Sequence, residues 1–544
     1  MQTKLLCPEQ DASALEQAGA LLRAGEVVGI PTETVYGLAA NALDPQAVAR
    51  IFEAKGRPQD NPLIVHIADV KEMENIAAVV PEQAKQLADA FWPGPLTIIL
   101  PKQDRIPMVT SGGLNTVGIR FPSHPLAQAI IRAAGVPLAA PSANLSGRPS
   151  TTTAQHVMED LNGKIAAVVE GGACSVGVES TVVSLCGDYP RLLRPGGISL
   201  EQLRSVLGRV DVDRALTEKI DDTEKVSAPG MKYRHYAPKA PVTVILGTPE
   251  QTTAYICEQL NCLPKEQFGV LAYTDHADAF RPSAIVEPFG NSDDMAEQAR
   301  EVFDALRRFD STPCTRIFAQ CPPSVGIGLA VANRIKKAAG FRIIDLSQPM
   351  KILGLTGGSG TGKSAACKAF SGCAVIDADA VYKKLLNENK QLSDDIQKQF
   401  GADVFTNGAL DRKKLGSIVF ADAEKLQQLN SITHPYIRRA VCAAFFDARA
   451  MGYHVCILDA PVLFEAGMQD LCDMTCAVLA PRETRIERIK KRDNISYEYA
   501  AARIDAQQPD DFYRAHCDAV LVNDGEWDAL QQQVQQLAQQ LKTL

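Results

Sequence analysis

The stretch GLTGGSGTGKS, residues 354–364, determines what the last third of the chain can be. From Gly357 onward it fits G-x-x-x-x-G-K-[ST], with an apolar run of strand type before it and residues 365–370, which can start a helix, after it. Strand, glycine loop and helix are the context of a phosphate-binding loop, because glycines let backbone N–H groups approach phosphate oxygens and the helix N-terminus adds partial positive charge. Lys363 can reach the outer phosphates and Ser364 can hold magnesium. The alternative, a chance glycine-rich loop, fits this context poorly.

The residues after the loop continue the same alternating pattern. Strand-like runs at 374–377 and 455–459 are separated by helical segments, which predicts a parallel sheet with helices on both faces over residues 350–544. The first strand ends in Asp377-Ala378-Asp379, where a carboxylate can accept a proton from an attacking hydroxyl. An Asp after a strand also commonly caps a helix, so we expect one catalytic and one capping Asp. Asp459, at the end of the second strand, could support magnesium or cap a helix.

Four arginines recur at spacings of three and four on one predicted helix: Arg482, Arg485, Arg488 and Arg492. This spacing places them on one helix face. A basic face is usually only solvated. Beside a nucleotide site, we favour a lid that clamps phosphate, since guanidinium matches phosphate bidentately.

Taken together, these motifs resemble the dephospho-CoA kinase family. The resemblance is carried by GLTGGSGTGKS, VIDADAVYKK (375–384), THPYIRR (433–439), LDAPVLFE (458–465), KKRD (490–493), ARIDAQQP (502–509) and CDAVLVNDG (517–525). It implies transfer of the ATP γ-phosphate to the ribose 3′-hydroxyl of dephospho-CoA, with Asp379 as general base, Lys363 as phosphate clamp and Mg²⁺ at Ser364. The implied ATP contacts are Gly358, Ser359, Gly360, Thr361, Gly362, Lys363, Ser364 and Ala365; the implied lid or substrate contacts are Arg485, Arg488, Arg492 and His434. Two positions depart from the family pattern: Ala365 replaces a usual Thr, and Lys383 stands where Arg is common.

Length and composition limit what the whole chain can be. Its 544 residues suggest three or four domains, and 46% apolar with 22% charged residues is typical of a globular protein. A net charge of −8 gives no global signature of nucleic-acid binding. No transmembrane-length run and no targeting segment are present, so we expect a cytoplasmic protein without membrane contact. The 14 cysteines contain no C-x-x-C pair, which predicts reduced thiols and no structural metal.

The first 350 residues divide into three parts. Residues 1–210 mix strands with helices, residues 211–239 have the acidic, Pro-Gly and aromatic-basic composition of a linker, and residues 240–346 form a small Rossmann-like α/β domain. With the domain at 350–544, the prediction is α/β throughout.

Polar groups in residues 1–210 gather at strand ends and turns. They lie in PTETVYGL (31–38), KGRP (55–58), VGIR (117–120), PSANLSG (141–147), ESTVV (179–183) and LRPG (193–196). Each is weak alone, since Lys-x-Arg is usually a solvated pair and Ser-x-Asn usually a turn. Six together predict a cleft for an anion and an amino acid.

This combination resembles the threonylcarbamoyl-AMP synthase family, with its YrdC-like α/β fold, in the longer two-domain form. Its hallmark motifs are Lys55/Arg57 and Ser142/Asn144. The resemblance implies that L-threonine, bicarbonate and ATP give threonylcarbamoyl-AMP and pyrophosphate, and that a partner complex transfers the product to tRNA. The implied threonine contacts are Thr34, His66, Arg120, Ala140 and Ser180. The implied ATP contacts are Lys55, Arg57, Asn61, Thr116, Ser142, Asn144, Ser150, Arg194 and Tyr233.

Three of these residues, Arg120, Lys55 and Tyr233, have a more specific expected role. Arg120 can hold the amino-acid carboxylate in a fork, and Lys55 would stabilise a carboxylated intermediate. His66 alone would more often be a core histidine. Tyr233 implies that the linker closes over the site as a lid.

Other readings of the first 346 residues stay open from sequence alone. They could form a regulatory or weakly RNA-binding module attached to an active kinase, or the middle domain could be a protein-interaction scaffold beside one inactive half. Intact motifs in both halves favour a bifunctional enzyme, and the acidic net charge speaks weakly against non-specific RNA binding.

Overall fold

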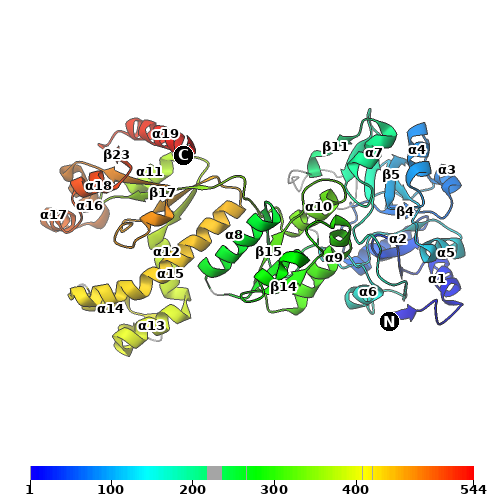
Figure 1. The fold of residues 1–544 in the computed structure, drawn as a ribbon, viewed down its shortest axis with the longest axis horizontal. Helices are drawn as coiled ribbons and strands as arrows, with labels where there is room; N and C mark the ends of the chain where they lie inside the picture. The colour runs from blue at the N-terminus through cyan, green and yellow to red at the C-terminus, as the bar shows by residue number, and fades with distance from the viewer. Residues whose placement is uncertain (1, 217–235, 265, 407–408, 420, 544) are drawn as a thin grey trace. The chain divides into compact units, whose positions relative to one another are not determined.

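The computed structural model describes residues 2–216, 236–264, 266–406, 409–419 and 421–543. The chain forms two compact units, one comprising residues 1–257 with 266–343 and the other residues 258–265 with 344–544. The α/β architecture is as predicted, and each unit is described below by itself (Figure 1).

The first unit is built on a long mixed sheet. Within the described residues the strand order is β1 (Lys4–Leu6), β8 (Ala167–Val169), β2 (Val28–Ile30), β3 (Gly37–Asn41), β7 (Leu138–Ala139), β4 (Ile64–His66), β6 (Thr116–Arg120), β5 (Leu96–Pro101), β9 (Thr181–Ser184), β10 (Arg191–Arg194) and β11 (Asp211–Val212). The helices are α1 (Ala14–Arg23), α2 (Pro45–Lys55), α3 (Met73–Ile76), α4 (Glu82–Phe91), α5 (Pro125–Ala134), α6 (Ala154–Leu161) and α7 (Leu200–Leu207). Because β11 pairs with β10, the sheet extends past residue 210 into the stretch predicted as linker. Its polar composition suits a short sheet edge as well as a linker.

Local signals in the sequence explain where α2 begins and ends. The Asp44 side chain accepts from the backbone N–H of Gln46, Pro45 occupies the first turn, and Gly56 closes the helix at φ 62°. These caps place Lys55 at the helix end that faces the site.

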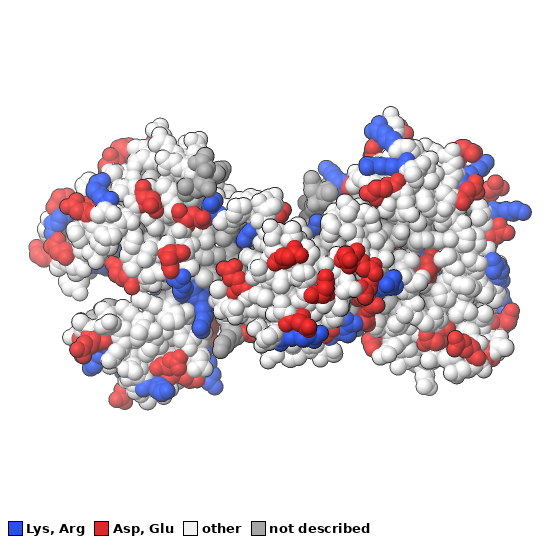
Figure 2. All heavy atoms as spheres, in the orientation of Figure 1, with Lys and Arg blue, Asp and Glu red and all other residues white. Residues whose placement is uncertain are grey.

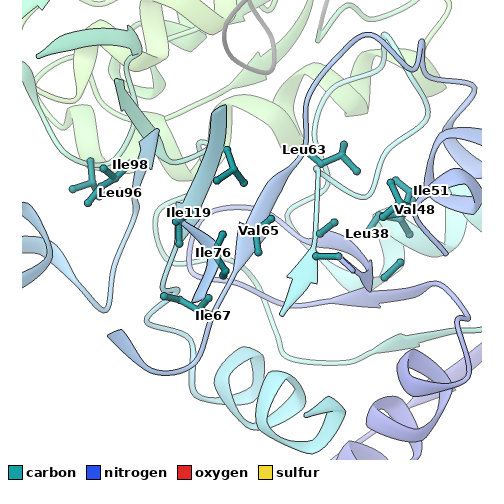
Figure 3. Close-up of a cluster of buried hydrophobic side chains, with 14 of the residues drawn as sticks. Leu38, Val48, Ile51, Leu63, Val65, Ile67, Ile76, Leu96, Ile98 and Ile119 are labelled. Atoms are coloured by element: carbon teal, nitrogen blue, oxygen red, sulfur yellow. The ribbon is translucent and has the colours of Figure 1, made fainter. Parts of the chain in front are cut away.

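The core of this unit lies on both faces of the sheet. Figure 3 shows one cluster, in which strand residues such as Leu38, Val65 and Ile119 pack with Val48 and Ile51 of α2. On β3, Ala39 belongs to the cluster on the opposite face. A sheet buried on both faces holds its strand ends rigidly, and the polar side chains of the site lie at those ends.

The small domain in the same unit has a five-stranded sheet. Its order is β14 (Ile285–Pro288), β13 (Phe268–Ala272), β15 (Arg316–Gln320), β12 (Val242–Leu246) and β16 (Ile343–Asp345), and the pairs of β12, β13 and β14 are parallel. Its helices are α8 (Pro249–Cys262), α9 (Met295–Arg308) and α10 (Gly328–Ala338). The parallel order agrees with the Rossmann-like prediction.

The second unit has a five-stranded parallel sheet. Its order is β18 (Ala374–Asp377), β21 (Val455–Asp459), β17 (Lys351–Thr356), β22 (Met474–Leu479) and β23 (Ala519–Val522). The helices are α11 (Lys363–Ala369), α12 (Ala378–Glu388), α13 (Lys390–Phe400), α14 (Arg412–Val419), α15 (Ala423–Ala450), α16 (Arg482–Asp493), α17 (Tyr497–Asp505), α18 (Asp510–His516) and α19 (Trp527–Thr543). In addition, β19 (Phe405–Thr406) pairs antiparallel with β20 (Ala409–Leu410).

Helices cover both faces of this sheet, as the sequence predicts. On β21, Ile457 packs in the cluster that includes Leu530 and Val534 of α19, whereas Cys456 and Leu458 pack on the other side, in the cluster of α15. Alternation of this kind is typical of a strand buried on both faces. Among the described residues, none of the helices is long and apolar enough to cross a membrane.

Candidate active sites

The kinase-like site is built around the loop between β17 and α11. Gly362 begins α11 at φ 96°, and a Cβ there would lie 2.0 Å from Nδ2 of Asn523, so only glycine fits. Lys363 Nζ donates to the Gly357 carbonyl at 2.9 Å and folds its side chain back along the loop. The loop borders a cleft of about 800 Å³, which is large enough for a nucleotide.

The structure brings most of the predicted kinase residues to this cleft. Those that line it are Gly358, Ser359, Gly360, Gly362, Lys363, Ser364, Asp379, Arg488 and Arg492. Thr361, Ala365, Arg485 and His434 are not among the lining residues. Thr361 is buried within the loop, where its hydroxyl donates to the Gly358 carbonyl at 2.9 Å.

Acidic side chains from two strand ends face the loop. Asp377 caps α12 by accepting from the Ala380 N–H at 3.0 Å, Asp379 lies in the first turn of α12, and both line the cleft. Asp459 also lines the cleft, and its Oδ1 is buried without a hydrogen-bond partner. Burial raises the pKa of Asp459; Lys363 opposes this, and Asp377 and Asp379 add to it. Burial likewise lowers the pKa of Lys363.

The four arginines of α16 have different surroundings. Arg488 and Arg492 line the cleft, whereas Arg485 is buried, donates from Nε to the Ser359 carbonyl at 3.0 Å and pairs with Asp510. Arg482 pairs with Asp505 at 3.0 Å and is absent from the lining. The predicted stripe therefore separates into two residues that line the cleft, one that contacts the loop and one that lies outside the lining.

Several residues that line the cleft were not predicted as site residues, and Gln507 and Arg503 are two of them. Gln507 accepts from the Ser359 N–H at 2.8 Å and donates to the Ser359 hydroxyl at 2.9 Å, and Arg503 lines the cleft while pairing with Asp493. Both follow α16 in the chain and lie within the quoted ARIDAQQP motif (502–509), which was the available signal.

A second site lies in the first unit, where strand ends and turns meet around a cavity of about 60 Å³. The predicted residues that line it are Lys55, Arg57, His66, Arg120, Ala140, Ser142, Asn144, Ser180 and Arg194. Its other polar linings are Glu179, Tyr236 and Ser146. Of these, Glu179 and Ser146 stood in quoted motifs and Tyr236 in the predicted linker, but none was predicted as a site residue.

Lys55 holds the Ser-x-Asn turn. Its Nζ donates to the carbonyls of Ser142 and Asn144, both at 2.5 Å, and the Ser142 hydroxyl donates to Asn144 Oδ1 at 2.5 Å. Burial, with the nearby Arg57, holds the pKa of Lys55 well below its usual range. Lys55 is therefore buried and Arg57 half-buried, so the pair is not simply a solvated one.

Two further arginines make the cavity cationic. Arg194 donates from Nε and Nη2 to the Ser180 carbonyl at 3.1 and 2.9 Å, while Arg57 donates to the Pro62 carbonyl at 3.3 Å and keeps its Nε without a partner. Burial lowers the pKa of each guanidinium to about 10, so both remain charged at neutral pH. Buried cations with donors to spare are suited to bind an anion.

Arg120 and His66 lie on neighbouring strands, because β4 and β6 pair in parallel with His66 opposite Arg120. Arg120 Nη2 lies 2.7 Å from Oε1 of Glu33, both side chains are buried, and Arg120 Nε has no hydrogen-bond partner. Burial would raise the pKa of Glu33, but Arg120 lowers it. Burial and Arg120 lower the pKa of His66 to about 3, so its ring is neutral.

Several predicted contacts lie outside the cavity lining. The Thr34 hydroxyl contacts that of Thr32, Thr116 lines a separate small cavity with Val182, and Asn61 is buried. The Ser150 hydroxyl donates to Oε1 of Glu179 at 2.6 Å and thus reaches the site indirectly. Tyr233 and the predicted lid fall within residues 217–235, outside the described residues.

Family models cover both sites. One described as "Telomere recombination", for the Sua5, YciO and YrdC proteins, matches residues 20–196, one for "Threonylcarbamoyl-AMP synthase, C-terminal domain" matches 198–340, and one for "Dephospho-CoA kinase" matches 351–529.

Individual relatives agree with these models. The chain is 50% identical to a threonylcarbamoyl-AMP synthase of Bacillus subtilis over 331 residues, 61% of this chain and 94% of the relative. It is 40% identical to a dephospho-CoA kinase of Corynebacterium diphtheriae over 197 residues, 36% of this chain and 98% of the relative. The crystal structure of Sua5 from Pyrococcus abyssi complexed with L-threonine matches with 45% identity and a TM-score of 0.59, covering 64% of this chain and all of that one.

The fold and the two sites define an ATP-dependent transferase that ends in a phosphate-binding-loop kinase. The chain belongs to the threonylcarbamoyl-AMP synthase family over its first part and to the dephospho-CoA kinase family over its last.

Proposed function

We infer that the chain is a bifunctional enzyme. The first unit forms threonylcarbamoyl-AMP and pyrophosphate from L-threonine, bicarbonate and ATP, and the second phosphorylates the ribose 3′-hydroxyl of dephospho-CoA. The observation that carries this conclusion is that two sets of anion-binding side chains lie in separate compact units, each with its own family relatives.

In the kinase, we assign the proton acceptor to Asp379. The 3′-oxygen attacks the γ-phosphorus, the bond to the β-phosphate oxygen breaks, and the hydroxyl proton passes to the Asp379 carboxylate as ADP leaves. Lys363, Arg488 and Arg492 face the same cleft and can neutralise the charge that spreads over the phosphoryl oxygens.

Magnesium fits the donors on the ATP side of the cleft. Ser364 and the unpartnered Oδ1 of Asp459 are hard oxygen donors of the type that Mg²⁺ prefers. Among the described residues there is no group of three or more His, Cys, Asp or Glu side chains arranged to hold a metal. Mg²⁺ commonly takes only one or two carboxylates and fills its shell with phosphate and water, so this pair suffices. When bound, the ion would neutralise phosphate charge.

Replacing Asp379 tests the kinase assignment. We expect Asp379→Asn to lower kcat for CoA formation by about a hundredfold or more, because general base catalysis contributes roughly 10²–10⁴-fold, with little change in the KM for ATP. Asp377→Asn is the matched control, because an amide oxygen can still cap α12. A kcat for Asp379→Asn within a few-fold of the unmodified chain would remove Asp379 from the base role.

In the synthase, we assign threonine to the Arg120 side of the cavity. The guanidinium can hold the amino-acid carboxylate, and the neutral His66 beside it can accept a hydrogen bond without adding charge. Arg57 and Arg194 can bind the triphosphate, and Lys55, which lines the same cavity, can stabilise a carboxylated intermediate. The cavity is several-fold smaller than the roughly 300 Å³ of an ordinary ligand pocket, so the lining has to open to admit ATP.

Pyrophosphate release from ATP tests the synthase assignment. Release that requires both L-threonine and bicarbonate is expected, and release without threonine would contradict the synthase assignment.

We propose that a tRNA-modification complex consumes the product. On the face drawn in Figure 2, basic and acidic side chains are interspersed. Salt-dependent RNA binding without threonine chemistry would favour the RNA-binding module instead.

A further inference from the structure

The small domain forms part of the wall behind the synthase cavity. One apolar cluster joins Val35 and Val178 of the first domain to α9 and α10 residues such as Phe303 and Val331. Gly177 lies so close to α9 that a Cβ there would come 2.3 Å from the Arg300 Cα. The two domains therefore share a close-packed core directly behind the loop that carries Glu179 and Ser180.

Arg334 of α10 reaches from this core to the cavity lining. Its side chain is fully buried, and its Nε donates to Oε2 of Glu179 at 2.7 Å. Its guanidinium carbon also lies 5.7 Å from the ring centroid of Tyr236, within cation–π range. Glu179 and Tyr236 both line the cavity, so one small-domain side chain supports two of its walls.

Glu179 connects Arg334 to the substrate-facing groups. Its other oxygen, Oε1, accepts from the Ser150 hydroxyl at 2.6 Å, and the next residue, Ser180, accepts from Arg194 at both its carbonyl and its hydroxyl. Burial alone would raise the pKa of Glu179, but Arg334 and Arg194 lower it to about 2, so the carboxylate is ionised. With Arg334 absent, a buried carboxylate beside the triphosphate-binding Arg194 would lose its ion-pair partner.

We propose that Arg334 is a positioning residue of the synthase site, which fixes the Glu179 carboxylate and, through it, the Ser180–Arg194 contact. The small domain thereby supplies a side chain that holds the lining of the synthase cavity in place. This inference rests on the synthase function and site proposed above.

The test uses the full-length chain with Arg334→Met and Arg334→Lys, measured by threonine-dependent pyrophosphate release. We expect Arg334→Met to lower kcat by roughly tenfold to a hundredfold through misplacement of the site, with the KM for threonine changed by less than about threefold. Arg334→Lys keeps the charge and should recover part of the kcat. If Arg334→Met does not fold, the kcat of Arg334→Lys is compared with that of the unmodified chain instead.

Arg307→Met is the matched control. Arg307 of α9 is also buried and pairs with Asp160 across the same interface at 2.9 Å, and it donates to the backbone carbonyls of Pro149 and Ser150, but neither Asp160 nor Arg307 lines the cavity. Both Met variants should lower Tm, since each removes an ion-pair partner of a buried carboxylate, although Asp160 keeps Arg148 at 2.6 Å, but only Arg334→Met should lower kcat beyond about threefold. Equal losses of kcat in the two variants would reduce Arg334 to a structural role and overturn the proposal.

A double-mutant cycle tests the route through Glu179. In a Glu179→Gln background, Arg334→Met should lower kcat much less than in the unmodified chain. Additive losses would contradict the route. No threonine-dependent release from the unmodified chain would contradict the synthase assignment itself, whereas normal release from both that chain and Arg334→Met would overturn only the role of Arg334.

Discussion

At the scale of single residues, the two reactions depend on cationic side chains that the fold shields from solvent. Arg120 is buried beside Glu33, and its Nε is unpartnered, so a carboxylate that enters the cavity can complete its hydrogen bonding. Lys363 is enclosed in the kinase loop in a comparable way, folded against the Gly357 carbonyl. Arg120 is buried and Lys363 half-buried, so each cation has lost part of its hydration before the substrate anion binds.

Arg120→Ala should raise the KM for threonine by about tenfold or more, because loss of a hydrogen bond to a charged group costs about 1.5–3 kcal/mol. The KM for ATP should change less. Arg194→Ala is the reciprocal variant and should affect ATP more than threonine. Initial-rate kinetics with each substrate varied will separate the two, and a reversed pattern would contradict the carboxylate assignment.

At the scale of elements, the orientation of a helix determines which of its charged residues line a site. On α16, Arg492 lines the cleft, whereas Arg482 pairs outside it with Asp505. Arg492→Ala should therefore lower kcat/KM for ATP in CoA formation by about tenfold, and Arg482→Ala should leave it within about twofold. Equal effects on kcat/KM would show that the whole face of α16 contacts the nucleotide.

On α10, Lys337 provides a test by pH. Burial first, and then the positive Arg334 and Arg194, lower its pKa to about 7, below the roughly 10.4 of an unfolded lysine. Between these values the unfolded chain binds more protons than the folded one, so this group makes the free energy of unfolding rise with pH. Below about pH 7 the folded state must hold a buried charge.

Lys337→Met removes that unfavourable burial, so it should raise Tm near pH 7, and its advantage should shrink toward pH 10. Thermal unfolding at several pH values measures this. Lys336→Met, at the neighbouring half-buried position, controls for replacing a lysine in this helix. A Tm advantage that grows with pH would contradict the assigned direction.

How far the sequence predicted these elements depended on whether the signal was local. The phosphate-binding loop and the α/β alternation are encoded in neighbouring residues, and the structure agrees with both predictions. The edge strand β11 was taken as linker because its pairing with β10 is not visible in its own composition. Glu179 gains its surroundings from Arg334, 155 residues away, and Ser150 faces Glu179 instead of the cavity, so neither could be placed without the tertiary fold.

At the scale of the whole molecule, the chain consists of two compact units, each with its own anion site. The first unit needs both of its domains, since small-domain arginines meet acidic residues of the first domain. The kinase loop and its acidic and basic partners all come from residues 357–513. The two chemistries therefore draw on separate sets of side chains, and we expect them to fail independently.

The most direct measurement of this central claim compares both reactions in one preparation of the unmodified chain and of Lys363→Ala. Threonine- and bicarbonate-dependent pyrophosphate release and CoA formation from dephospho-CoA would be followed in parallel. The account predicts that Lys363→Ala abolishes CoA formation and leaves pyrophosphate release within about twofold, because Lys363 serves only the kinase cleft. Loss of both activities from a folded variant would contradict the claim that the chain holds two independent active sites.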